Sequence, residues 1–187
     1  RDLHGLIGIL TMPFIHGGFD HLISNSVPIF ILSVSIIYFY RSLGYKVISL
    51  IWIVGGILTW AFARGDSYHI GASGLVYGFA AFIFLSGTLR NNRNLLAISL
   101  AVAFGYGSMV WGVFPTDSGI SWEGHLMGMI SGSLMAWWYR DEGPKPKKWS
   151  WEIEEEEEEE EKQNEEIASQ SDITIKYEYL TDVDDTK

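Results

Sequence analysis

Five long apolar stretches, all of them free of charged residues, constrain the fold of this chain more than any other feature. They cover approximately residues 22–40, 47–63, 71–89, 95–114 and 124–139. A helix needs about 20 mostly apolar residues to cross the core of a bilayer. The helices of a large soluble bundle would carry charged outer faces, and these stretches offer none. We therefore predict an all-α fold, a polytopic bundle of membrane-spanning helices.

The segment before the first span is apolar but too short to cross a membrane. Residues 3–15 carry no charged side chain, and Pro13, followed by Gly17 and Gly18, would interrupt a helix there. We expect an interfacial or re-entrant piece. The chain begins with Arg1 rather than Met, inside a pattern that reads as continuing, so we also expect residues to be missing upstream.

The formal charge of −10 is divided unevenly along the chain. Residues 1–140 hold seven basic and five acidic residues, whereas residues 141–187 hold six basic and 18 acidic residues. The run of glutamates at 154–161 repels itself and cannot build a core. We therefore predict a transmembrane domain at 1–140 and an acidic, disordered cytoplasmic tail at 141–187.

Composition and spacing argue against several kinds of site. The sequence has no basic stripe that would bind nucleic acid. Cysteine is absent, which rules out a disulfide framework and a thiol nucleophile. Three histidines could be considered as metal ligands, but they lack the HExxH spacing and a carboxylate or thiolate partner, so we expect neither a metal nor another cofactor. These are His16, His21 and His125.

The charges in the connections between spans predict the orientation of the chain. Basic residues flank the connections after the first and third spans and follow the last span, which places these points on the cytoplasmic side. They are Arg41, Lys46, Arg90, Arg93, Arg140, Lys145, Lys147 and Lys148. Five polar residues then lie at one depth near the outer face, where the first, third and fifth spans begin. They are His16, His21, Asn25, Ser73 and His125.

The polar residues at the outer face have the composition of a hydrolytic site. A serine hydroxyl becomes a nucleophile when a base lies within hydrogen-bond reach, and His125 is the best candidate for the base of Ser73. The spans contain no acidic residue that could orient His125, and Glu123 is expected to point elsewhere, so we predict a dyad rather than a triad. His21 and Asn25 are four residues apart on one helical face, where they could donate to an oxyanion together with the Ser73 N–H.

Some of these residues also have a purely structural interpretation. His21 and Asn25 could serve only to tie loops together. For His16 this interpretation is at least as good as a supporting role at the oxyanion. For His69, four residues before Ser73, we expect a surface role.

Small residues offer a way to bring two spans together. Glycine pairs with i, i+4 spacing let helices approach closely in lipid. The two pairs are Gly74 with Gly78, and Gly128 with Gly132. The second pair shares the helical face of His125, and Tyr77 shares the face of Ser73, from which it could pack on the imidazole. The alternative is that these glycines serve helix packing alone.

Three motifs together resemble those of the rhomboid family of intramembrane serine proteases. The family pattern is His-x4-His-x3-Asn, then Gly-x-Ser-Gly-x2-Tyr, then a small residue before a histidine that is followed by Gly-x3-Gly. The matching residues are His16, His21, Asn25, Gly71, Ser73, Gly74, Tyr77, Gly124, His125, Gly128 and Gly132. The resemblance covers about residues 1–140 and implies a six-helix core, of which this chain holds five spans and lacks the first.

The resemblance implies an intramembrane serine endopeptidase that needs no cofactor. Ser73 would be the nucleophile and His125 the general base, with His21, Asn25 and the Ser73 N–H around the oxyanion. The substrates would be transmembrane segments of other proteins that enter laterally from the bilayer. The membrane would be the bacterial cytoplasmic membrane, with the site toward its outer face. Alternatives are a catalytically silent relative that binds transmembrane helices, and a transporter or channel, whose polar residues would be spread through the membrane depth.

Overall fold

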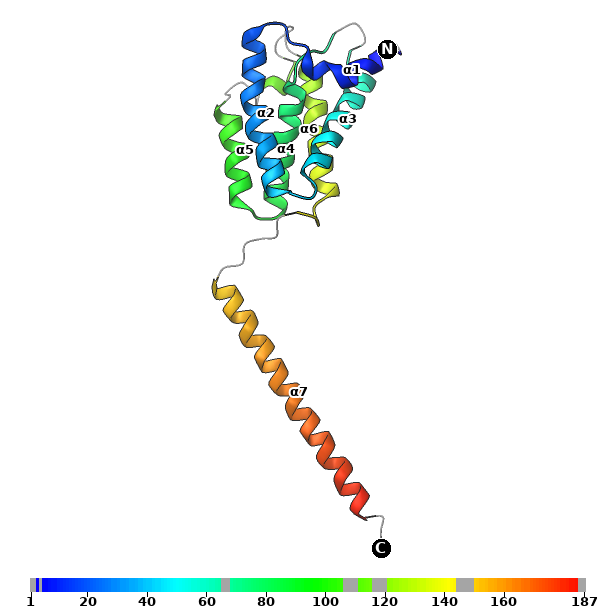
Figure 1. Cartoon of the computed structure of the whole chain (residues 1–187), viewed down its shortest axis with the longest axis vertical. Coiled ribbons are helices and arrows are strands. Elements are labelled where there is room, and N and C mark those ends of the chain that lie inside the picture. The colour runs from blue at the N-terminus through cyan, green and yellow to red at the C-terminus, as the bar shows by residue number, and fades with distance from the viewer. Residues whose placement is uncertain are drawn as a thin grey trace. The chain divides into compact units, whose positions relative to one another are not determined.

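The computed structural model of this chain describes residues 3, 5–64, 68–105, 111–115, 121–143 and 150–184. Within these residues every regular element is a helix, as predicted for an all-α protein (Figure 1). The chain divides into two units, Arg1–Pro146 and Lys147–Lys187.

The first unit is a bundle of helices that lie side by side (Figure 1). The five predicted spans are occupied by α2 (Phe19–Phe39), α3 (Gly44–Phe62), α4 (Ser73–Leu89), α5 (Arg93–Gly105) and α6 (Trp122–Trp138). α2 and α3 are long and apolar enough to cross a membrane, whereas α4 and α5 are shorter apolar helices. α4 contacts each of the other four helices.

Short elements precede the first long helix and tie it to the rest of the bundle. α1 (Gly5–Thr11) packs against α3, where Nε1 of Trp52 donates to the carbonyl of Ile9 at 3.0 Å. It is followed by the short 3-10 helix η1 (Met12–Phe14), which contains Pro13. The N–H of Gly71 donates to the carbonyl of Met12 at 3.1 Å. This bond ties the segment before α2 to the loop that leads into α4.

Local sequence signals set the connection between α4 and α5. α4 ends at Leu89, two residues before Asn91, whose φ of 50° lies in the left-handed region that asparagine tolerates. The side chain of Asn92 then caps α5, because its Oδ1 accepts the N–H groups of Asn94 and Leu95 at 3.1 and 3.4 Å.

The structure describes only part of the predicted fourth span, residues 95–114. α5 ends at Gly105, and Trp111–Val113 forms a separate 3-10 turn, labelled η2. Residues 106–110 lie outside the described part of the chain.

The core of the bundle is apolar, and so is much of its surface. Fully buried side chains include Phe79 and Phe82 of α4 and Leu32 of α2. Large apolar side chains also lie on the outside, for example Phe30 and Phe104, which are 69% and 77% exposed. Soluble monomers rarely present extended apolar surface of this kind to water. In a bilayer the same side chains contact lipid.

The second unit contains the helix α7 (Ser150–Asp184), which differs from the disordered tail expected at 141–187. Glutamate, lysine, glutamine and alanine all have good helix propensity, which favours a helix in this segment. Nζ of Lys162 pairs with Glu158 one turn away at 3.5 Å. The described side chains of α7 are exposed, so this helix builds no core of its own.

Candidate active site

Ser73 is the first residue of α4 and follows a tight turn. Gly71 in this turn has a φ of +98°, a left-handed conformation that glycine adopts without strain. A side chain at position 71 would also collide with the ring of His21, since an added Cβ would lie 2.7 Å from two ring atoms. Gly71 therefore lets the start of α2 approach the start of α4 closely.

The side chains of Ser73 and His125 are in contact, although the two residues are 52 positions apart. Oγ of Ser73 lies 2.7 Å from Nε2 of His125, which is buried in the first turn of α6. The other ring nitrogen, Nδ1, lies 2.8 Å from the backbone carbonyl of Gly112. Because a carbonyl only accepts, Nδ1 carries the hydrogen and donates it. Nε2 is then free to accept the hydrogen of the Ser73 hydroxyl.

Gly112 is a part of the site that sequence reasoning missed. It contacts His125 through a main-chain oxygen, so no side-chain pattern marks it. The signal that the sequence offers is the glycine itself, since this position has no room for a side chain. An added Cβ would overlap the hydroxyl of Tyr77 and lie 3.1 Å from Nδ1 of His125. Tyr77 itself stacks on the imidazole, with ring centroids 4.2 Å apart and an interplanar angle of 14°. Apart from its hydrogen bond with Ser73, the imidazole is thus fixed by one hydrogen bond and one stacked ring.

The other polar residues singled out by sequence lie at the start of α2. Asn25 is 6% exposed, and its Nδ2 donates to the carbonyl of His21 at 2.9 Å. An amide NH₂ has two hydrogens, so a second one remains for another acceptor. The rings of His16 and His21 meet edge to face, with centroids 5.1 Å apart. Through the contact of His21 with Gly71, this group borders the turn that carries Ser73.

The two glycine pairs lie where α4 meets α6. A Cβ added to Gly128 would overlap the carbonyl of Gly74, and one added to Gly132 would overlap the carbonyl of Gly78. The two backbones are therefore in direct contact along a strip of the bundle that begins beside Ser73. This close approach brings α6, and with it His125, against α4.

Residues 4–142 match the family model described as the rhomboid domain. The chain belongs to the rhomboid family. An uncharacterized protein of Mycobacterium leprae is 36% identical over 140 residues, which are 71% of this chain and 55% of that protein. An uncharacterized protein of Mycobacterium tuberculosis is 33% identical over 141 residues, 71% of this chain and 59% of that protein. RHOMBOID-like protein 4 of Arabidopsis thaliana is 28% identical over 137 residues, 68% of this chain and 32% of that protein.

Membership of the rhomboid family makes this chain an integral membrane protein and connects it to intramembrane proteolysis in general. The chain spans between half and two thirds of the length of the two mycobacterial relatives. No solved structure matches it.

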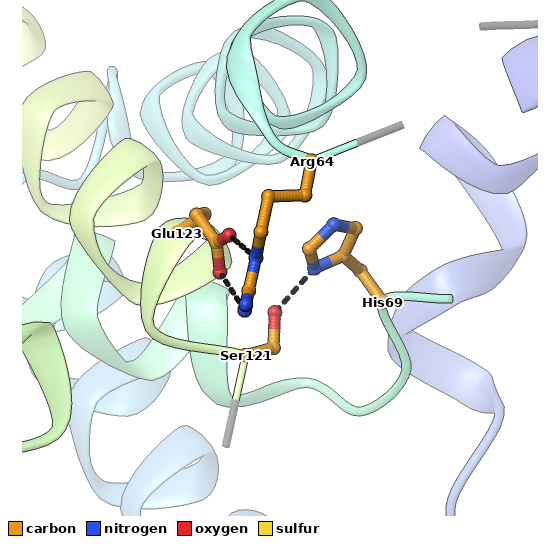
Figure 2. Close-up of polar contacts among 4 residues, drawn as sticks. All are labelled: Arg64, His69, Ser121 and Glu123. Atoms are coloured by element: carbon orange, nitrogen blue, oxygen red, sulfur yellow. Dashed lines mark hydrogen bonds and ion pairs between the residues drawn. The ribbon is translucent and has the colours of Figure 1, made fainter. Parts of the chain in front are cut away.

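A second polar cluster in this rhomboid joins the segment before α4 to the start of α6 (Figure 2). Arg64 forms an ion pair with Glu123 through Nε, and its Nη2 donates a second hydrogen bond to the same carboxylate at 3.2 Å. Nδ1 of His69 lies 2.5 Å from Oγ of Ser121. We call these four residues, Arg64, His69, Ser121 and Glu123, the clasp.

The clasp corrects one expectation and agrees with another. The surface role expected for His69 is incomplete, because its side chain is half-buried and contacts Ser121. Burial lowers the pKa of His69 below its ordinary value, although the charge of Glu123 opposes this shift. Glu123 is directed to Arg64, as expected for a residue that points away from His125. In the described part of the chain the side chain of His125 is hydrogen-bonded to Ser73 and to a backbone carbonyl, and no carboxylate takes that place.

Proposed function

We propose that this chain is an intramembrane serine endopeptidase in which Ser73 is the nucleophile and His125 the general base. The observation that carries the proposal is the 2.7 Å contact between Oγ of Ser73 and Nε2 of His125. The hydrogen bond of Nδ1 to Gly112 supports it, because it favours the imidazole tautomer that accepts a proton at Nε2. The exposed apolar surface of the bundle supports a reaction that takes place in lipid.

The proposed reaction follows the route of other serine hydrolases. Nε2 of His125 takes the hydroxyl proton while Oγ of Ser73 bonds to the carbonyl carbon of the scissile peptide. His125 then gives this proton to the leaving amine as the peptide C–N bond breaks, which leaves an acyl group on Ser73. Water attacks the acyl group with His125 again as base, and Ser73 is regenerated. The substrates in this proposal are transmembrane segments, and the site faces the outer side of a bacterial cytoplasmic membrane.

The proposal is tested by cleavage of a transmembrane substrate in liposomes, together with labelling by a fluorophosphonate, which reacts with activated serines. We expect cleavage that the fluorophosphonate blocks, and labelling that depends on Ser73. Absence of both, with binding of the substrate helix retained, would instead favour a catalytically silent helix-binding protein.

Asn25 is expected to supply one of the hydrogen bonds to the oxyanion. Loss of one such donor typically costs about 10²–10³ in kcat, so Asn25→Ala should reduce turnover by roughly this factor. Labelling of Ser73 should persist, since the nucleophile and base remain. The measurement is kcat in liposomes, with Asn94→Ala as the matched control, because Asn94 is exposed at the start of α5.

A structural role for Asn25 predicts a different result. If Asn25 only ties the turn of α2 to His21, its replacement should lower the unfolding midpoint and leave kcat per folded enzyme unchanged. His21→Ala is expected to impair turnover less than Asn25→Ala, because the remaining donors still face the oxyanion.

Gly128 is expected to set the distance between the two reacting residues. Gly128→Ala places a methyl group against the carbonyl of Gly74, so α4 and α6 must separate near Ser73 and His125. A displacement of about 1 Å can cost about 10²-fold in rate, and we expect a loss of this order. Cleavage is measured per folded enzyme, with Gly105→Ala as the control, because an added Cβ there meets no atom within 4 Å. Equal rates for the two variants would contradict the close-packing argument.

A further inference from the structure

The clasp connects the two segments that lead to the reacting residues. Arg64 and His69 lie in the segment that leads into α4 and so to Ser73. Ser121 and Glu123 lie four and two residues before His125. Figure 2 shows both interactions reaching from one segment to the other. The two halves of the proposed dyad are therefore joined by a second set of contacts, outside the dyad itself.

The Ser121 contact acts directly on the backbone of His125. The carbonyl of Ser121 accepts the N–H of His125 at 3.2 Å, in the first turn of α6. Ser121 is also the N-cap residue of this helix, a position where a serine hydroxyl commonly caps a backbone N–H. Here the side chain makes no capping bond, and its hydroxyl contacts His69 instead. The hydroxyl at the start of α6 therefore binds His69, in the segment before α4, instead of capping its own helix.

The Arg64 contact fixes the same turn through a buried carboxylate. The side chain of Glu123 is 5% exposed, whereas that of Arg64 is 54% exposed. A buried carboxylate is costly unless it is paired, and a guanidinium that offers two N–H groups defines its direction. The carboxylate of Glu123 is therefore held toward Arg64, which lies just after the end of α3.

The first turn of α6, which contains His125, packs directly against the first turn of α4. A Cβ added to Gly74 would lie 3.0 Å from the carbonyl of Gly124, so this turn rests directly on the first turn of α4. No side chain lies between them to absorb a displacement. A shift of this turn therefore changes the distance between Nε2 of His125 and Oγ of Ser73.

We propose that Arg64 and Glu123 are positioning residues, which hold the first turn of α6 in place and thereby set the contact between His125 and Ser73. His69 and Ser121 support the same turn through their hydrogen bond. This inference rests on the proposed serine-protease function. It assigns the ion pair a role in the reactivity of Ser73 beyond its contribution to folding.

The test separates the reactivity of Ser73 from the amount of folded enzyme. Fluorophosphonate labelling has a rate constant, which reports reactivity, and an endpoint, which reports the fraction of competent sites. The variants are Glu123→Gln, Arg64→Met and the double variant, reconstituted in liposomes. The matched control is Asp141→Asn, which removes the exposed Arg140–Asp141 pair, whose atoms lie 3.5 Å apart.

We expect either single variant to lower the labelling rate constant and kcat by about tenfold, because a small displacement of the base is enough to slow proton transfer. KM and the labelling endpoint should change little. The double variant should be no slower than the slower single variant, since each change removes the same ion pair. Arg64→Lys, which keeps the charge, should recover part of the rate, and Asp141→Asn should match the wild type.

Two results would overturn the inference while leaving the proposed function intact. One is an unchanged rate constant with a reduced endpoint, which means that the pair only stabilises the fold. The other is an unchanged rate constant and endpoint in every clasp variant. Failure of the proposed function is recognised separately, because Ser73→Ala would then label as fast as the wild type.

Discussion

Ser73→Ala is expected to reduce cleavage of a transmembrane substrate to a small residual rate. Loss of the nucleophile of a serine hydrolase costs on the order of 10⁶-fold in kcat. The substitution removes one hydroxyl, which lies 2.7 Å from Nε2 of His125, and leaves the backbone of α4 unchanged. The fold should therefore persist. The measurement is cleavage per folded enzyme in liposomes, together with the unfolding midpoint.

A second serine provides the control for this prediction. Ser35 is half-buried on α2, and its hydroxyl donates to the carbonyl of Ile31 in the same helix at 2.7 Å. Ser35→Ala should cleave at the wild-type rate. Cleavage at that rate by Ser73→Ala would exclude Ser73 as the nucleophile.

His125→Ala is expected to abolish turnover almost as completely as Ser73→Ala. Without the imidazole, the hydroxyl of Ser73 loses its proton acceptor, and residues that act as one unit show losses of similar size. The variant also leaves the Gly112 carbonyl without its donor and the Tyr77 ring without its stacking partner, so it should unfold more easily. Turnover must therefore be normalised to folded protein.

The double variant tests whether the two residues act together. Ser73→Ala with His125→Ala should be no slower than either single variant, because each change alone already disables the dyad. If the losses instead multiply, the two side chains act independently, and the assignment of His125 as the base of Ser73 would fail.

The helical character of the fold was predictable because the bilayer leaves few alternatives. A backbone in lipid must satisfy its hydrogen bonds internally, so uncharged stretches of about 20 residues become helices. The all-α prediction is confirmed in the described residues. For the predicted fourth span the structure describes α5 up to Gly105 and a 3-10 turn at Trp111–Val113, with residues 106–110 outside the described part.

Helical periodicity also predicted which residues lie next to Ser73 and His125. Tyr77 lies one turn after Ser73, and Gly128 lies on the face of His125, so their neighbourhood follows from spacing along a helix. The structure brings Tyr77 onto the imidazole and Gly128 against Gly74. Whether Ser73 and His125 carry out the proposed reaction stays a prediction until the variants are measured.

The sequence by itself determined that the long apolar stretches are helices and on which face the serine, histidine and glycine residues lie. Those properties depend on composition and on the helical repeat. Only the tertiary structure decided that the carbonyl of Gly112 binds His125, and that Arg64 reaches Glu123 across 59 positions of sequence. Contacts of this kind use main-chain atoms or irregular segments, which have no periodicity. They form only after the packing of α3, α4 and α6 has brought distant parts of the chain together.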